Sequence, residues 1–284
     1  ELVRRGITSS DIRAVITIGS RGCLTCAGTL AKAFSAQGPV VGLDNLEILV
    51  DRTAFRDFLS RHGFSVPNYQ TVETPDEPVI VTAPMVVKCA LGTSGSEGLS
   101  LVLEESNLRH AVIHAQDVIR HQPVKRIIIE AYITGRDVGV FGLFLKGELQ
   151  FHDYVLRQVH DFPHCLPKRY QIQKAFSDTE KELLKTDFEA LARALGVSTG
   201  PFYTEYRLTD DGERCFALEC EPTLPAYAAK LISNSIGRDL NELFVDVVVS
   251  GRLPDLSADN RRYSGCKIGL GINGHHYHRR YYHE

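Results

Sequence analysis

Three carboxylates in the last third of the chain constrain its fold more than any other feature. Two mostly apolar runs, 202–208 and 215–220, flank a short polar turn, a pattern that predicts a β-hairpin. Side chains alternate between the faces of a strand, so Glu219 and Glu221 share one side. The length of the turn places Glu205 opposite Glu219 on the partner strand. We therefore expect three carboxylates to converge on one face of the hairpin.

Such a cluster needs cations, because like charges this close destabilise a folded chain. Oxygen ligands without a paired histidine are typical of Mg²⁺ or Mn²⁺, and Mg²⁺ commonly joins one or two carboxylates to substrate phosphates. Glu205, Glu219 and Glu221 are therefore candidate metal ligands. A solvated acidic hairpin is the alternative, and the apolar residues Phe202 and Phe216 beside the acids make it less favourable.

A glycine-rich segment suggests a second function, phosphate binding. Residues 91–98 hold three glycines, including Gly95, together with Ser96 and other small hydroxyl residues. Backbone N–H groups in such a loop can close over phosphate oxygens. By itself such a segment is more often an ordinary turn, and it matches neither common nucleotide-binding glycine motif. Lys88 lies in the apolar run 85–89 just before it, where a charge is costly unless it meets an anion, and this favours the phosphate interpretation.

A third candidate is an acid that follows three isoleucines. Glu130 comes directly after the run 127–129, and Ala131 and Tyr132 continue an extended segment whose backbone could contact an adenine edge. Asp137 follows closely. On this segment alone, an ordinary edge-strand glutamate is as good an explanation.

The remaining pattern predicts a mixed α/β (α+β) chain. Strand, helix and strand patterns at 14–19, 23–34 and 40–43 suggest the end of a parallel-sheet unit, and we expect part of that unit to precede Glu1. Further helices are expected at 45–62, 107–120, 179–195 and 239–250, and further strands at 79–82, 85–89, 99–103, 126–133 and 138–145. Residues 158–175 are interpreted as a substrate-facing loop region.

Charge and hydropathy exclude some partners. The chain holds 32 Lys plus Arg against 35 Asp plus Glu, without a concentrated basic region outside the C-terminal end, so nucleic acid is not an expected partner. No apolar run approaches the length of about 20 residues that a helix needs to span a bilayer, so no membrane partner is expected either. Seven irregularly spaced cysteines suggest reduced thiols and a cytoplasmic location. Cys23 and Cys26 are expected to be two buried thiols rather than a redox or zinc motif.

These motifs, in this order, resemble the ATP-grasp superfamily from about Ile12 to Pro254, and within it the carboxylate–amine ligases similar to D-alanine ligase and the carbamoyl-phosphate-synthase type. The residues that carry the resemblance are Asp51-Arg52, Lys88 with Gly92 to Gly98, Glu130-Ala-Tyr132, Gly135-x-Asp137, and Glu205 with Glu219-Cys-Glu221. The resemblance implies two α+β subdomains that clasp ATP, preceded by the end of a parallel-sheet preliminary domain. It places the preliminary domain at 1–45, the lid subdomain with its linker helix at 46–131, the metal-binding subdomain at 132–256 and a tail at 257–284.

The same resemblance implies roles for single residues. Lys88 and Arg52 would contact nucleotide phosphates under a lid that includes Gly95 and Ser96. Glu130 and the backbone at Ala131 and Tyr132 would hold adenine, and Asp137 the ribose. Glu205, Glu219 and Glu221 would bind Mg²⁺ (or Mn²⁺), so that Glu219, Glu205 and Lys88 form the catalytic set.

The resemblance implies an ATP-dependent ligase that joins a small-molecule carboxylate to an amine through an acyl phosphate. Two alternatives stay open: activation of bicarbonate, as in carboxylases and carbamoyl-phosphate-type enzymes, and nucleotide binding without catalysis. The cation that stabilises the acyl phosphate is not assigned. Its candidates are Lys168, Arg169, Lys174, Arg207 and Lys230. The oligomeric state is also open, a homodimer included, and the histidine-rich end of the tail is expected to be flexible.

Overall fold

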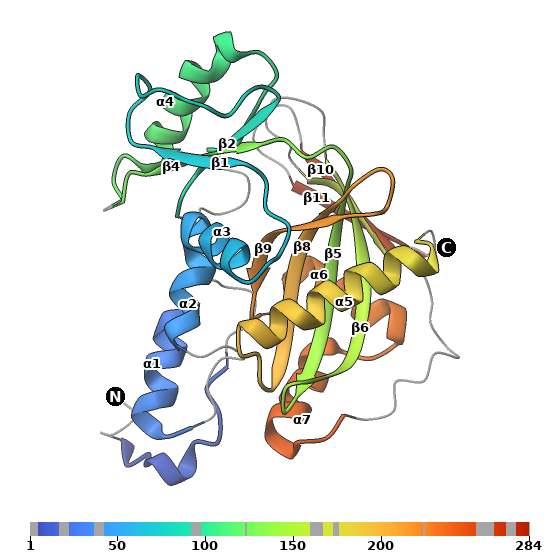
Figure 1. Cartoon of the computed structure of the whole chain (residues 1–284). Coiled ribbons are helices and arrows are strands. Elements are labelled where there is room, and N and C mark those ends of the chain that lie inside the picture. The colour runs from blue at the N-terminus through green and yellow to red at the C-terminus, as the bar shows by residue number, and fades with distance from the viewer. Residues whose placement is uncertain are drawn as a thin grey trace.

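The computed structural model describes residues 5–16, 23–36, 43–91, 98–122, 124–159, 167–172, 176–223, 225–253, 264–270 and 277–283. In these ranges the chain forms two antiparallel sheets and a set of helices that cover them (Figure 1). The mixed fold class predicted from the sequence is confirmed. The strands expected at 14–19 and 40–43 lie largely outside the described residues.

The small sheet has four strands in the order β1-β4-β2-β3. Its elements are β1 (Tyr69–Val72), β2 (Met85–Cys89), β3 (Ser100–Val102), a 3-10 turn at Glu105–Asn107, α4 (Leu108–Ile119) and β4 (Ile127–Ala131). Helix α4 packs on one face, where its apolar side meets alternate residues of β2 and β4 such as Val87 and Ile129. The opposite face of the same two strands carries Lys88 and Glu130, because side chains alternate along a strand.

The strand expected at 79–82 is wrong. A side chain, instead of a neighbouring strand, satisfies the backbone there: Gln70 accepts from the N–H of Ile80 at 2.6 Å and donates to the carbonyl of Pro78 at 2.9 Å. Ile80 is 85% exposed, so its apolar side chain reflects no buried strand position. The hairpin of β2 and β3 around the glycine-rich segment is confirmed.

The large sheet has seven strands in the order β11-β10-β7-β6-β5-β8-β9. Its strands are β5 (Arg136–Leu145), β6 (Glu148–Val159), β7 (Pro167–Ile172), β8 (Gly200–Leu208), β9 (Cys215–Glu221), β10 (Ser264–Leu270) and β11 (Tyr277–His283). Strands β6 and β7 take up part of the region interpreted as a loop at 158–175. Strands β10 and β11 add backbone pairing to the segment expected as a tail, which therefore continues the sheet in its described part.

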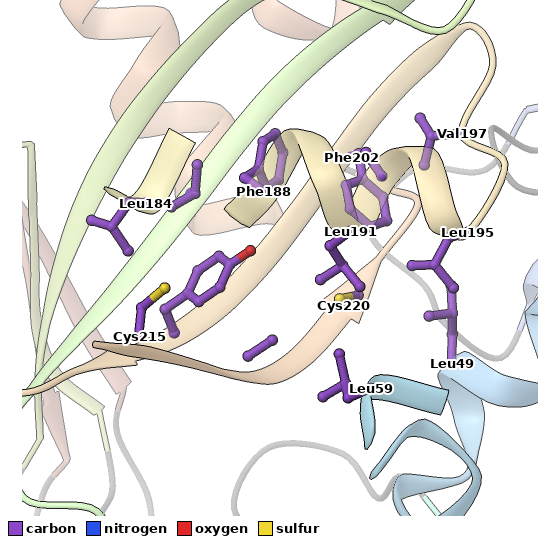
Figure 2. Close-up of a cluster of buried hydrophobic side chains, with 14 of the residues drawn as sticks. Leu49, Leu59, Leu184, Phe188, Leu191, Leu195, Val197, Phe202, Cys215 and Cys220 are labelled. Atoms are coloured by element: carbon purple, nitrogen blue, oxygen red, sulfur yellow. The ribbon is translucent and has the colours of Figure 1, made fainter. Parts of the chain in front are cut away.

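Helices cover both faces of this sheet. Helix α5 (Asp178–Ala194) crosses one face, while α6 (Ala226–Ile236) and α7 (Leu240–Ser250) lie on the other (Figure 1). The α5 side forms the larger apolar core, in which Phe188 and Leu191 meet Phe202 of β8 and Cys220 of β9 (Figure 2). Helix α5 begins with a capping box in which Ser177 and Glu180 exchange hydrogen bonds, which fixes its first turn.

A column of helices connects the N-terminal part to the small sheet. It consists of a 3-10 turn at Ser9–Asp11, then α1 (Leu24–Phe34), α2 (Leu43–Val50) and α3 (Arg52–Arg61) (Figure 1). The single helix expected at 45–62 is thus two helices, because Asp51 has extended backbone and caps the N-terminus of α3. Leu49 of α2 and Leu59 of α3 pack in the α5-side core (Figure 2), so this column belongs to the large sheet by packing.

Cys23 and Cys26 are both exposed, so the expectation of two buried thiols is wrong. Helix α1 buries the side that carries Leu24, Ala27 and Ala31, and both cysteines lie off that side. In the part of the chain that the structure describes, no helix is both long and apolar enough to cross a membrane.

Candidate active site

Helix α3 brings its first residue to the base of the glycine-rich segment. The carboxylate of Asp51 accepts hydrogen bonds from the N–H groups of Thr53 and Ala54, and the N–H of Arg52 donates to the carbonyl of Ala90 at 2.8 Å. Arg126 forms an ion pair with Asp51 at 2.5 Å. The start of α3 is therefore held against the end of β2, immediately before residues 92–97.

Arg52 spans the two sheets from this position. Its Nη1 donates to the carbonyl of Cys89 at 2.9 Å, and its Nε donates to Oε1 of Glu219 at 2.8 Å. Its Nη2 also contacts the same oxygen. The structure thus brings together a residue predicted to bind phosphate and a residue predicted to bind metal. In this state the guanidinium is the counterion of Glu219.

The charge of Lys88 meets a carboxylate of the protein. Nζ of Lys88 donates to Oε2 of Glu130 at 2.6 Å, and both side chains are buried. Burial lowers the pKa of Lys88, and Glu130 opposes that effect. Burial alone would raise the pKa of Glu130, but Arg56 and Lys88 outweigh it and hold that pKa at about 2. Lys88 thus meets an anion, as its place in an apolar run predicts, and that anion is Glu130 of the protein itself.

Arg56 completes this cluster, and the sequence analysis missed it. It lies one helical turn after Arg52, and its side chain is fully buried. Its Nε donates to Oε1 of Glu130 at 2.5 Å, while its Nη1 donates to the carbonyls of Ala217 and Leu218 at 3.1 Å each. The signal in the sequence is the i,i+4 spacing of two arginines on the helix side that also carries the apolar residues Phe55 and Leu59.

The contacts of Arg56 to β9 fall at an irregular point of the hairpin. Glu205 pairs with Glu219, and the next residue of β8, Tyr206, pairs with Ala217, so Leu218 is an extra residue in β9. Arg56 donates to the two carbonyls at this bulge, directly before Glu219. It therefore connects Glu130 of the small sheet to the backbone that carries a candidate metal ligand.

The predicted pairing of Glu205 with Glu219 is confirmed, and Glu221 pairs with Tyr203. Burial raises the pKa of Glu205; Arg157 opposes that effect, and Glu219, Asp137 and Glu221 raise the pKa further. Nη1 of Arg157 lies 3.0 Å from Oε2 of Glu205. Among the described residues, no group of three or more His, Cys, Asp or Glu side chains is gathered closely enough to hold a metal ion.

The donor set nevertheless fits Mg²⁺. This ion prefers oxygen ligands and is usually held by one or two carboxylates, with water and substrate phosphates at its other positions. Glu205 and Glu219 lie opposite each other on paired strands, and an arginine neutralises each of them. Two facing acids that both require a cation are a suitable pair for such an ion.

Asp137 is buried and engaged by two arginines. Nε of Arg207 lies 2.9 Å from its Oδ1, and Nη2 of Arg157 lies 3.4 Å from its Oδ2. Arg207 also donates to the carbonyl of Gly135 at 3.2 Å and stacks over the ring of Tyr132. The expected contact of Asp137 with a ribose would have to compete with these ion pairs.

The backbone at the predicted adenine contact is partly occupied. The N–H of Ala131 donates to the carbonyl of Asn68 at 2.8 Å, and the N–H of Tyr132 donates to the carbonyl of Pro84 at 3.0 Å. A purine edge would therefore use other backbone groups of this segment. Gly95 and Ser96, the predicted lid contacts, lie outside the described residues.

Two antiparallel sheets joined through a buried cluster of basic and acidic side chains define a protein of the α+β class. The family follows from comparison with known domains. The model of the ATP-grasp domain matches residues 81–229, just over half of the chain. The chain therefore belongs to the ATP-grasp family, as its motifs predicted.

Known proteins of this family share the fold at low identity. The L-amino acid ligase of Bacillus licheniformis superposes with a TM-score of 0.76 and 19% identity, covering 94% of this chain and 64% of that protein. Biotin carboxylase of Campylobacter jejuni, solved in a complex with β,γ-ATP, superposes with a TM-score of 0.69 and 15% identity, covering 88% of this chain and 58% of that protein. The carbamoyl phosphate synthase large chain of Rubrobacter xylanophilus is 22% identical over 257 residues, which are 86% of this chain and 24% of that protein. The chain thus spans only part of the relatives it matches.

Proposed function

We propose that the protein is an ATP-dependent ligase that activates a small-molecule carboxylate as an acyl phosphate and transfers the acyl group to an amine. The observation that carries this proposal is the pairing of Glu205 with Glu219, each beside an arginine, next to the buried Lys88–Glu130 pair. The motifs that resemble carboxylate–amine ligases and the fold shared with an L-amino acid ligase support it.

In the proposed reaction an oxygen of the substrate carboxylate forms a bond to the γ-phosphorus of ATP. The bond from that phosphorus to the β,γ-bridging oxygen breaks, and ADP leaves with its electron pair. The amine nitrogen then attacks the acyl carbon, phosphate leaves with the electrons of the acyl C–O bond, and the nitrogen loses a proton to solvent. A Mg²⁺ ion at this site would offset negative charge on the transferred phosphoryl group.

The residues of this chain have distinct tasks in that scheme. Glu205 and Glu219 would hold the ion, and Glu221, predicted as a third ligand, would have to move closer to join them. When the ion takes over Glu219, Arg52 can turn its guanidinium to a phosphate. Lys88 would contact the nucleotide phosphates from the floor of the small sheet, while Glu130 and Arg56 keep its position. The protein contributes mainly positioning and electrostatic stabilisation.

Activation of bicarbonate is the second candidate function. The observation that favours it is the similarity to a carbamoyl phosphate synthase chain and to biotin carboxylase. Such an enzyme would use the same metal and phosphate contacts but accept bicarbonate in place of an organic carboxylate.

An acceptor screen separates these candidates. We would measure ADP and phosphate released from ATP and Mg²⁺ with a pool of amino acids and, separately, with bicarbonate. ADP formation that requires amino acids and disappears in Glu219→Gln supports the ligase, and ADP formation with bicarbonate alone supports the second candidate. ATP binding without turnover on either acceptor would contradict both and favour a binding function.

A further inference from the structure

Arg157 occupies the point where the proposed metal site meets the rest of the large sheet. It lies on β6, directly opposite Asp137 of β5 and Tyr170 of β7. Its Nη1 is 3.0 Å from Glu205 and its Nη2 is 3.4 Å from Asp137. One guanidinium thus bridges Glu205 of β8, a candidate metal ligand, and Asp137, a buried acid on the neighbouring strand β5.

We infer that Arg157 is the side chain that binds the anionic group of the carboxylate substrate and of its acyl phosphate, once a divalent cation has displaced it from Glu205. This inference rests on the proposed function, since that function supplies the cation and the anionic substrate. Arg157 would then be the cation that stabilises the acyl phosphate, a role for which the sequence suggested other residues.

Binding of a divalent cation would exchange the partners of Glu205. An arginine and a divalent cation compete for the same carboxylate oxygens, and the ion carries twice the charge at a shorter distance. When the ion binds, Arg157 loses the shorter of its two ion pairs. The longer one leads to Asp137, which Arg207 already neutralises at 2.9 Å. The guanidinium then keeps Asp137 and the hydroxyl of Tyr170 as partners, and its five N–H donors leave room for a new anion.

The other described basic candidates are engaged elsewhere or lie away from this face. Arg207 pairs with Asp137, donates to the carbonyl of Gly135 and stacks over Tyr132, which occupies its guanidinium. Arg169 pairs with Gln158 rather than with Arg157, so strand alternation places it on the opposite face of the sheet. Lys230 on α6 is exposed. The side chains of Lys168 and Lys174 lie outside the described residues.

A planar guanidinium can donate two parallel hydrogen bonds to a carboxylate or a phosphate. In this structure the two terminal nitrogens of Arg157 already contact two different carboxylates, so both donors point into the acidic face. A substrate carboxylate that replaces Glu205 as partner would lie beside the ion held by Glu205 and Glu219, which is the position phosphoryl transfer requires.

The inference is tested first with Mn²⁺ alone, whose binding is measured by electron paramagnetic resonance without nucleotide. The proteins are the wild type, Arg157→Gln, the charge-conserving Arg157→Lys and the matched control Arg193→Gln, which alters an exposed arginine of α5. Removing the competing guanidinium should tighten Mn²⁺ binding by about tenfold in Arg157→Gln, the change that roughly 1.4 kcal/mol produces. Arg157→Lys and Arg193→Gln should bind Mn²⁺ as the wild type does.

The second arm measures the anion. Inorganic phosphate is titrated by calorimetry into each protein after saturation with Mn²⁺. Phosphate affinity should fall at least fivefold in Arg157→Gln, recover partly in Arg157→Lys and stay unchanged in Arg193→Gln. Replacing an arginine with a purely structural role would not tighten metal binding and weaken anion binding at the same time. Opposite changes in Mn²⁺ and phosphate affinity therefore identify the proposed role.

Failure of this inference is distinguishable from failure of the proposed function. Unchanged Mn²⁺ affinity in Arg157→Gln overturns the inference, and so does unchanged phosphate affinity, whatever the turnover of the wild type. If both affinities change as expected but the wild type forms no ADP with any acceptor, the anion site stands and the ligase proposal falls.

Discussion

Nε of Arg56 lies 2.5 Å from Oε1 of Glu130, and this buried ion pair joins helix α3 to the small sheet. The same guanidinium donates to the backbone of β9 next to Glu219, so one side chain connects the two sheets on which the site is built. The accuracy of the site therefore depends on a residue that we place outside the contacts to substrate.

Replacing Arg56 with Met should strongly destabilise the fold. The change leaves Glu130 with Lys88 as its remaining cation of this cluster and leaves two carbonyls of β9 without their donor, a loss of about 3 kcal/mol or more. Urea unfolding would measure it. Arg61→Met, on an exposed position of the same helix, is the control and should change the free energy of unfolding by less than about 0.5 kcal/mol. Equal effects in the two variants would contradict the role of Arg56.

Glu130 should make stability depend on acid pH. Its pKa is about 2 in the folded protein and 4.5 is its ordinary value, so its contribution is full above about pH 4.5 and is lost as the pH falls towards 2. That contribution is on the order of 3 kcal/mol. The difference in unfolding free energy between wild type and Glu130→Gln should therefore be larger at pH 7 than at pH 3. The exposed Glu148→Gln should show no such change, and a constant difference for Glu130→Gln would refute the assignment.

Asp187 on α5 should have the opposite pH dependence. Burial raises its pKa to about 6, with Tyr206 and Cys215 opposing, so the folded protein binds a proton that the unfolded chain releases near pH 3.8. Stability should fall as the pH rises from about 4 to 6. Asp187→Asn should then gain on the order of 3 kcal/mol at pH 7 and little at pH 4. The exposed Asp246→Asn is the control, and a gain that is equal at both pH values would rule out titration of Asp187.

Gly135 should tolerate no side chain. Its φ is +151°, and a Cβ atom would lie 2.0 Å from the carbonyl oxygen of Leu208. Gly135→Ala should therefore cost about 3 kcal/mol or more, because backbone must move. Gly147 also has a positive φ, but its nearest neighbour would be 3.8 Å away, so Gly147→Ala should cost only about 1 kcal/mol. Thermal unfolding of Gly147→Ala measures backbone strain alone, and thermal unfolding of Gly135→Ala measures backbone strain together with the clash.

Local patterns predicted the parts of the site that depend on neighbouring residues. Alternation along one strand and the length of one turn were enough to place Glu205 opposite Glu219, and the bounds of β2 around Lys88 were predicted without error. These features depend on backbone periodicity within a hairpin, which a single sequence displays.

The contacts between distant segments could not be predicted in this way. The partner of Lys88 is 42 residues away along the chain, and the partner of Arg52 is 167 residues away. Periodicity holds no information on such pairings. Strand β6 was also missed, because its alternation is interrupted by polar residues such as His152 and Asp153 that fit a sheet covered on both faces.

The most direct test of the proposed reaction follows one oxygen atom of the substrate carboxylate into phosphate. Wild-type protein is incubated with ATP, Mg²⁺ and a pool of amino acids labelled with ¹⁸O in their carboxylates, and the released phosphate is analysed by mass spectrometry, with Glu219→Gln beside it. Activation through an acyl phosphate predicts one ¹⁸O atom in each phosphate released with ADP, and no such phosphate from the variant. Phosphate that is released with ADP but carries no ¹⁸O would contradict the account, because the γ-phosphorus would then have been attacked by an oxygen from another source.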